Sequence, residues 1–235
     1  MNTDLEGVDG IFIGILIVVL IGTIASAAQI YKTRGIRKRS LDLKFLATRL
    51  GFTFNPNRDE GFAMGWGFLD KLAQGSERYA FNILRGKHKE RPVFVFDYHY
   101  QSISGKRIED HYLTILMLVV QEVFPQVTIK PESLLSKAAA ALGFENIKFE
   151  SAEFSRLFCV RSQDKRFAYD VCNPQMIEYL LANRDLEIEI QGPVVLLAFE
   201  KQLSAQEIDF NLRRLFEIRL RLPEYLFSQK AVQSS

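Results

Sequence analysis

The side chains best suited to chemistry are histidines and carboxylates near the middle of the chain and one distant cysteine. One residue separates Asp97 from His99, Asp110 and His111 are adjacent, and Cys172 lies further along. A carboxylate can orient an imidazole, and the oriented imidazole can deprotonate a thiol. Cys172 as nucleophile, His99 or His111 as base and Asp97 or Asp110 as the orienting group would together form a thiol hydrolase.

The same region could instead bind a metal ion or perform acid–base chemistry. Glu109 precedes Asp110 and His111, and two neighbouring strands could bring these side chains to Asp97 and His99. The competing interpretation is a solvated sheet edge beside turns. The CxxC and HxxxH spacings typical of metal sites do not occur in the sequence. We therefore expect no resident metal and no cofactor.

The two cysteines also have a simpler interpretation as buried apolar residues. Cys159 lies between Phe158 and Val160, and Cys172 follows Val171. Free cysteine is among the most buried residue types, whereas a nucleophilic cysteine needs an exposed, electropositive setting. A disulfide between them would require an oxidising compartment.

The elements that must position these residues are β-strands. Residues 92–101 alternate, which places Asp97 and His99 on one face. The other face carries four aromatic side chains: Phe94, Phe96, Tyr98 and Tyr100. That aromatic face could pack against the chain's own helices or bind a partner. Residues 78–84 form a hairpin with this strand, and residues 112–120, apolar on both faces, are typical of a central covered strand.

The remaining elements complete an α+β pattern. Further strands are expected over residues 126–130, 147–150, 157–162, 186–191 and 194–200, the last two joined by a turn at Gly192 and Pro193. Helices are expected at Ser40, Pro131, Asp164, Asn173 and Ser204, which are cap or first-turn residues. This order predicts a mainly antiparallel sheet with flanking helices, preceded by one transmembrane helix.

Residues 11–30 are expected to form that transmembrane helix. The segment carries no charged side chain, and at about 1.5 Å per residue it covers a hydrocarbon core of about 30 Å. A cleaved signal peptide is the alternative, because Ala25, Ser26 and Ala27 resemble a cleavage site. Residues 1–10, however, contain acidic residues and no lysine or arginine, unlike the start of a signal peptide.

Basic residues after this segment predict its orientation. The expected contacts with the membrane surface are Lys32, Arg34, Arg37, Lys38 and Arg39. The positive-inside rule then places residues 1–10 outside, the juxtamembrane residues 31–50 on the inner face of the plasma membrane, and the domain of residues 51–235 in the cytoplasm. The lipid bilayer is thus the first expected partner.

Small residues in the predicted membrane helix permit a homodimer. Gly10 and Gly14 are four residues apart, and so are Gly22 and Ser26. Such spacing lets two helices approach closely. Glycine is also common in membrane helices that do not associate.

Two classes of binding are disfavoured. No GxxxxGK[ST] or GxGxxG motif follows a predicted strand, which argues against a nucleotide site. The net charge of the chain is +2, and its local basic excess is explained by topology, which argues against nucleic acid.

Several short stretches together resemble an uncharacterised group of small, membrane-anchored bacterial proteins. They are LGFTF at 50–54, FDYHY at 96–100, IKPE at 129–132 and FCVRSQD at 158–164, with the uncharged segment before them. The resemblance covers most of the chain and implies the topology and fold class given above. It assigns no activity and no catalytic residue.

The leading hypothesis is therefore a membrane-tethered cytoplasmic module that binds or scaffolds an unidentified protein partner. The alternative is a membrane-anchored hydrolase or metal-dependent enzyme that uses Asp97, His99, His111 and Cys172.

Overall fold

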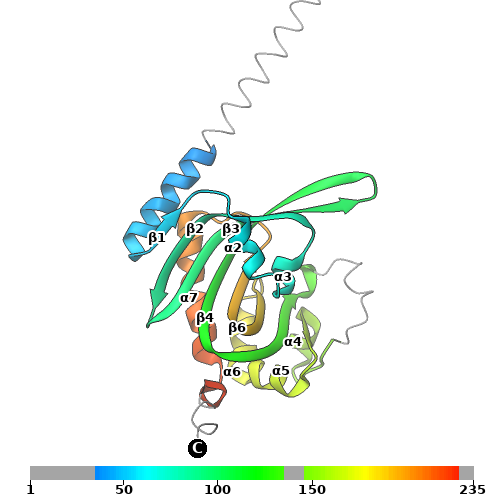
Figure 1. Ribbon diagram of the computed structural model, residues 1–235. Helices are drawn as coiled ribbons and strands as arrows, with labels where there is room; N and C mark the ends of the chain where they lie inside the picture. The colour runs from blue at the N-terminus through cyan, green and yellow to red at the C-terminus, as the bar shows by residue number, and fades with distance from the viewer. Residues whose placement is uncertain (1–34, 135–145, 228–235) are drawn as a thin grey trace, which may run out of the picture. The chain divides into compact units, whose positions relative to one another are not determined.

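The computed structural model describes residues 35–134 and 146–227. The chain divides into two units, Met1–Asp42 and Leu43–Ser235, and the sheet lies in the second (Figure 1). The predicted transmembrane helix at 11–30 lies outside the described residues. Within the described residues, no helix is both long and apolar enough to cross a membrane.

A helix covers residues 35–50. Ser40 was expected to cap this helix, and that prediction is wrong, because the chain is already helical at residue 35. Leu43, Leu46 and Ala47 are buried on one side of its second half. Gly51 then ends it with a positive φ of 69°.

Six strands of the described residues form one antiparallel sheet. They are β1 (Thr53–Asn55), β2 (Ser76–His88), β3 (Arg91–Ser104), β4 (Arg107–Pro131), β5 (Phe158–Ser162) and β6 (Glu187–Phe199). The α+β class with a mainly antiparallel sheet is confirmed. In Figure 1, β4 is the long curved strand, and β3, β5 and β6 pair with it.

β4 is central because both of its edges are paired. Its first half pairs with β3 and its last residues with β5, while β6 pairs along both halves. The sequence predicted two strands here, 112–120 and 126–130, but the structure has one bent strand. The pairing with β6 shifts register on both sides of Phe124, which faces Gly192. Such irregularities bend a strand without ending it.

β6 also runs through this bend, so the hairpin predicted within it does not form. Gly192 and Pro193 were expected to form a hairpin turn, but the strand continues through them. Gly192 has a φ of +54°, a backbone conformation that a residue without a Cβ adopts at little cost. The glycine therefore accommodates a bulge and does not reverse the chain.

Each face of the sheet packs against helices of this chain. One core contains Val93 and Val95 of β3 together with α4 (Ala152–Leu157), α5 (Lys165–Val171), α6 (Pro174–Ala182) and α7 (Ala205–Arg221). The other contains Phe96 and Tyr98 with α2 (Glu60–Gly65) and α3 (Asp70–Ala73). The predicted alternation of β3 is confirmed, and its aromatic face is covered by helices of the same chain.

Helix caps agree with the sequence in the second half of the chain. Asp164, Asn173 and Ser204 each accept a hydrogen bond from the third residue beyond, and Ser204 forms the expected capping box with Glu207. Two predictions fail. Pro131 belongs to β4, with a short 3₁₀ helix at Glu132–Leu134 after it, and the rest of the helix predicted through residue 142 lies outside the described residues. Residues 147–150 do not form a strand.

Candidate functional site

His99 is held on β3 by bonds to both of its ring nitrogens. Its Nδ1–H donates to the Glu77 carbonyl oxygen at 3.0 Å, and Nε2 lies 2.8 Å from Oδ1 of Asp110. The ring stacks on Tyr79, with centroids 4.5 Å apart, and is 4% exposed. Because both nitrogens already bond to protein oxygens, the imidazole links β2, β3 and β4. It is not free to take a proton from a nucleophile.

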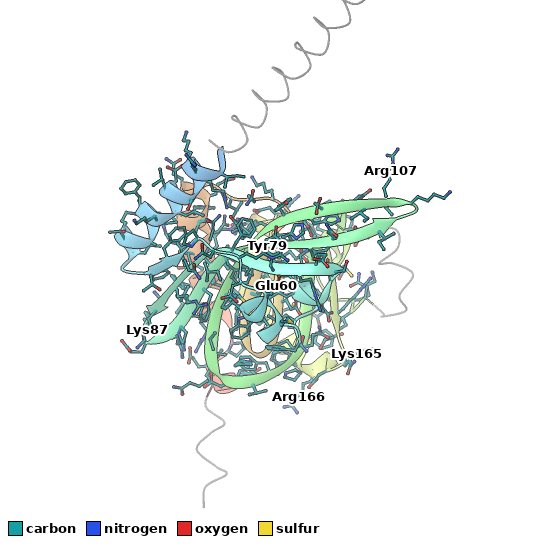
Figure 2. The ribbon with its side chains drawn as sticks, turned by 45° about the horizontal axis from the view of Figure 1, so that its top comes forward. Glu60, Tyr79, Lys87, Arg107, Lys165 and Arg166 are labelled. Atoms are coloured by element: carbon teal, nitrogen blue, oxygen red, sulfur yellow. The ribbon has the colours of Figure 1, made fainter. Side chains whose placement is uncertain are left out.

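The structure brings His99 and Asp110 together but separates His111 from them. Hydrogen bonds from Gln101 and His99 hold the pKa of Asp110 below its ordinary value. His111 is the next residue along β4, so its side chain points to the other face of the sheet. There it lies 2.7 Å from the Ser102 hydroxyl and stacks on an aromatic ring. Figure 2 shows that this hairpin projects from the body of the domain, with Arg107 at its tip.

Asp97 shares a face with His99, as predicted, but takes different partners. It accepts hydrogen bonds from the amides of Asn82 and Gln202, at 2.9 and 3.0 Å, and from the Thr114 hydroxyl at 3.1 Å. The carboxylate is 1% exposed. It ties β2, β3 and β4 to the segment before α7, which is a structural role.

Cys172 lies in the larger core, where α5 ends. The thiol is buried, and burial raises its pKa far above the ordinary value. Since the thiolate is the nucleophile, this setting suppresses reactivity. Cys159 on β5 is also buried, and both cysteines are free thiols. These positions match the interpretation of both cysteines as small apolar residues.

Some of the remaining predicted site residues lie in the described part of the chain and others lie outside it. Glu109 is exposed on β4. No cluster of three or more histidine, cysteine, aspartate or glutamate side chains within 35–134 and 146–227 could hold a metal ion. Of the predicted membrane contacts, Arg37, Lys38 and Arg39 lie in the helix over residues 35–50. The residues outside the described part are Lys32, Arg34, Gly10, Gly14, Gly22 and Ser26.

A buried group of charges, which sequence reasoning missed, holds α3 on the sheet. The Nζ of Lys71 lies 3.1 Å from both carboxylate oxygens of Glu187 and also bonds to Glu200. Lys130 approaches Glu187 at 2.9 Å. Burial disfavours the charge on Lys71, but the two carboxylates outweigh it and raise its pKa.

Glu189 completes this group. Its carboxylate accepts the backbone N–H groups of Asp70 and Lys71, at 2.6 and 3.0 Å, in the first turn of α3. Burial raises the pKa of Glu189. Glu187 and Glu189 are two residues apart on β6 and so share one face, but no local sequence pattern indicates that α3 covers them.

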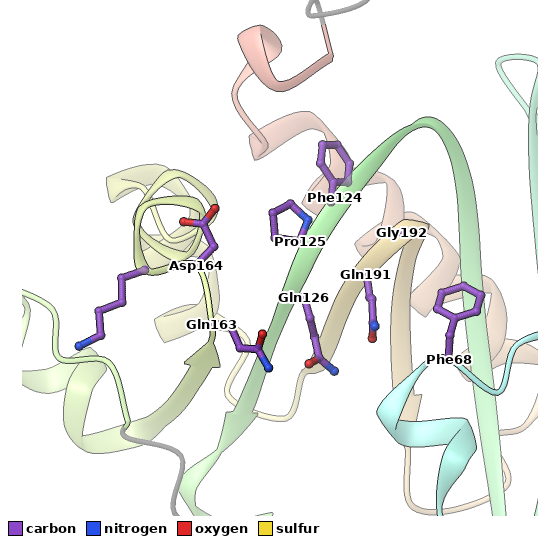
Figure 3. Close-up of a pocket in the computed structure, with 9 residues that line it drawn as sticks. Phe68, Phe124, Pro125, Gln126, Gln163, Asp164, Gln191 and Gly192 are labelled. Atoms are coloured by element: carbon purple, nitrogen blue, oxygen red, sulfur yellow. The ribbon is translucent and has the colours of Figure 1, made fainter.

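An open pocket of 870 Å³ lies beside this group, at the bend of β4 and β6 (Figure 3). It is lined by Phe68, Phe124, Pro125, Gln126, Gln163, Asp164, Lys165, Gln191 and Gly192. We call it the glutamine pocket, because three amides come together there from β4, from the residue after β5 and from β6. Figure 3 shows these amides in a row, with Phe68 on one side and Asp164 on the other.

Two amide atoms of the glutamine pocket have no partner. Gln126 Nε2 and Gln191 Oε1 are buried and make no hydrogen bond within the part of the chain that the structure describes. A buried polar atom without a partner costs about 1–3 kcal/mol. The carboxylate of Asp164 is engaged as the α5 cap, accepting the Phe167 N–H at 3.0 Å. The lining therefore favours recognition of neutral polar groups over proton transfer.

Comparison with known proteins identifies a fold but no family. No family model and no curated protein matches the chain. A solved structure does match, that of the mycobacterial trehalose monomycolate transport factor A, TtfA, with a TM-score of 0.59 and 17% identity. The match covers 81% of this chain and 97% of that one. At this identity the likeness shows a shared fold, and the neighbour is bacterial, like the group that the sequence resembles.

Proposed function

We propose that this chain is a membrane-tethered accessory protein that binds a partner through its glutamine pocket and does not catalyse a reaction. The observation that carries the proposal is a large open cavity lined by three glutamine side chains, Gln126, Gln163 and Gln191, with Phe68 beside them. Pockets of about 300–1,000 Å³ are typical of sites for small ligands. The ligand expected here presents neutral hydrogen-bonding groups beside an apolar surface that packs on Phe68.

The positions of the candidate catalytic residues support binding over hydrolysis. His99 is bonded at both nitrogens, Asp97 is bonded to three other side chains, and Cys172 lies in the core. A hydrolase needs a nucleophile within hydrogen-bond reach of a base that can accept its proton. These three residues serve different structural purposes.

The membrane tether is supported by the sequence. Residues 11–30 would span the bilayer, residues 1–10 would lie outside, and the basic residues from Lys32 to Arg39 would hold the domain on the cytoplasmic side. Self-association through the small residues Gly10, Gly14, Gly22 and Ser26 would be compatible with this arrangement. TtfA is named as a transport factor, and we extend to this chain only an accessory role at a membrane.

Site-specific crosslinking in living cells tests the proposal. Benzoylphenylalanine in place of Phe68, which is 42% exposed at the rim of the pocket, should give a discrete crosslinked product after illumination. That product should disappear when Gln191→Leu removes the amide without a large change in volume. The matched control is Gln175→Leu, the same substitution at an exposed position of α6, which should leave the product unchanged.

Two results would contradict the proposal. An identical crosslinking pattern in the Gln191→Leu variant would show that the pocket does not select the partner. Recovery of the full-length chain in the supernatant of carbonate-washed membranes would exclude the tether. A variant lacking residues 1–39 separates the two parts of the proposal, because it should lose the membrane fraction and keep the pocket.

A further inference from the structure

A second cavity, of 230 Å³, lies between the β2–β3 turn and the last turns of α7. We call it the basic pocket. Its lining is His88, Lys89, Arg91, Leu118, Phe216, Arg219, Leu220 and Glu224. Figure 2 marks this end of the sheet by Lys87, at the end opposite the hairpin tip with Arg107. None of these residues lines the glutamine pocket, so this inference is independent of the proposed function.

Positive charge in the basic pocket exceeds negative charge. Lys89, Arg91 and Arg219 face a single carboxylate, that of Glu224, which lies 3.3 Å from Arg219. Neither Lys89 nor Arg91 forms an ion pair within 35–134 and 146–227. Arg219 is 6% exposed, and its Nε makes no hydrogen bond to the described residues. Arg219 is therefore a buried cation that protein acceptors satisfy only in part.

The pKa of His88 reflects the same excess of positive charge. Burial lowers the pKa of His88, and the charges of Lys89 and Arg91 lower it further. Burial also lowers the pKa of Arg219, an effect that the hydrogen bond to Glu224 opposes and the charge of Arg91 reinforces. His88 is held flat against Phe216, with centroids 3.6 Å apart. His88 thus lies in a positive field, whereas the carboxylates of Glu224 and Glu122 partly offset the effect of burial on Arg219.

The turn that carries two of these cations has an unusual backbone. Lys89 and Glu90 have φ values of 48° and 64°. Two-residue hairpin turns of this type favour Asn-Gly, because other side chains are strained at positive φ. His88 and Arg91 are the paired residues on either side. The turn therefore fixes Lys89 and Arg91 at the mouth of the cavity at some conformational cost, a pattern that recurs at binding sites.

We propose that the basic pocket binds a phosphate group, held by Arg91 and Arg219 with Lys89 at the mouth. The cavity is smaller than the usual range of about 300–1,000 Å³ for whole ligands, so it suits one oxyanion and leaves the rest of the molecule outside. Guanidinium groups bind phosphate oxygens through paired N–H donors. The phosphate could belong to a soluble compound or to a phospholipid headgroup.

Isothermal titration of the full-length chain in neutral detergent micelles tests this site. Inorganic phosphate should bind saturably at pH 7. Arg91→Gln and Arg219→Gln should each weaken binding by about tenfold or more, since each removes charge-assisted hydrogen bonds. The matched control is Arg221→Gln on the same helix, because Arg221 bonds to Glu217 outside the pocket; it should bind like the unaltered chain.

A second ligand separates the two sources of phosphate. Short-chain phosphatidic acid, titrated in the same micelles, should bind more tightly than inorganic phosphate if the natural ligand is a lipid headgroup, and no more tightly if it is soluble. Because Arg219 also stacks on Phe227, circular dichroism must show that Arg219→Gln is folded. If Arg219→Gln does not fold, Arg91→Gln alone provides the test, because it breaks no ion pair. Saturable binding of neither ligand, or equal binding in Arg91→Gln, would overturn the proposal.

Discussion

Replacing Lys71 by methionine should destabilise the fold by about 3 kcal/mol. The Lys71 side chain is 3% exposed and the Glu187 side chain 4%, so the pair is not screened by solvent. Removing one partner of a buried ion pair costs roughly 3–5 kcal/mol, because the other charge stays buried. Lys130 remains 2.9 Å from Glu187 and Glu200 is 44% exposed. The expected loss is therefore at the lower end of that range.

Urea unfolding followed by Trp66 fluorescence measures this loss. The indole packs near Phe94 beside α2 and α3, with ring centroids 5.9 Å apart, so it reports on the region that Lys71 holds. With a urea dependence of about 2 kcal/mol per molar, the midpoint should fall by about 1.5 M. Lys201→Met is the matched control. Lys201 pairs with Glu207 at the surface, and its replacement should cost less than about 1 kcal/mol.

A double substitution separates the charge from the packing. Lys71→Met combined with Glu187→Leu should be less destabilising than Lys71→Met alone, because apolar pairs often replace buried ion pairs at little cost. The reasoning is refuted if Lys71→Met shifts the midpoint no more than Lys201→Met does. It is also refuted if the double variant is less stable than the single one.

Three further outcomes are expected. Gly75→Ala should lower the melting temperature more than Gly105→Ala. Both glycines have φ near +60°, but only at Gly75 would a Cβ overlap a carbonyl oxygen of β3. That overlap should add about 1–3 kcal/mol to the loss of folding free energy. Maleimide should modify Cys172 only after urea is added, since the folded thiol is buried and its pKa is raised; modification of the folded chain would contradict that placement. Hydrogen bonds from Lys201 and the helix N-cap lower the pKa of Glu207 from 4.5 to about 2. The stability that this carboxylate contributes above pH 4.5 should therefore be lost as the pH falls towards 2. Acid unfolding of Glu207→Gln should lack this loss of stability.

Locally encoded features of this fold could be predicted from the sequence. The caps at Asp164, Asn173 and Ser204 each depend on one side chain and a backbone N–H three residues away. The alternation of β3 likewise depends only on the pleat of a single strand. Such patterns were confirmed because no distant residue was needed to interpret them.

Features that depend on pairing between distant segments could not be predicted. Gly192 followed by proline favours a turn when only its neighbours are considered. In the structure, β4 continues past Phe124 on the opposite strand, and its pairing on both sides keeps β6 extended. The physical cause is that ladder hydrogen bonds over many residues outweigh the turn preference of two. For the same reason, two predicted strands of β4 merge into one.

The candidate site shows what alternation alone leaves open. Glu187, Glu189 and Gln191 occupy alternate positions of β6 and so share one face. The pattern identifies that face as polar but does not say what lies over it. α3 covers the two glutamates: Glu187 pairs with Lys71, and Glu189 accepts backbone N–H groups of α3. Gln191 lies further along the strand and lines the cavity with Phe68 (Figure 3). Three polar side chains on one strand face thus have different roles. The tertiary structure buries Glu187 and Glu189 with bonding partners, whereas Oε1 of Gln191 has no hydrogen-bond partner among the described residues.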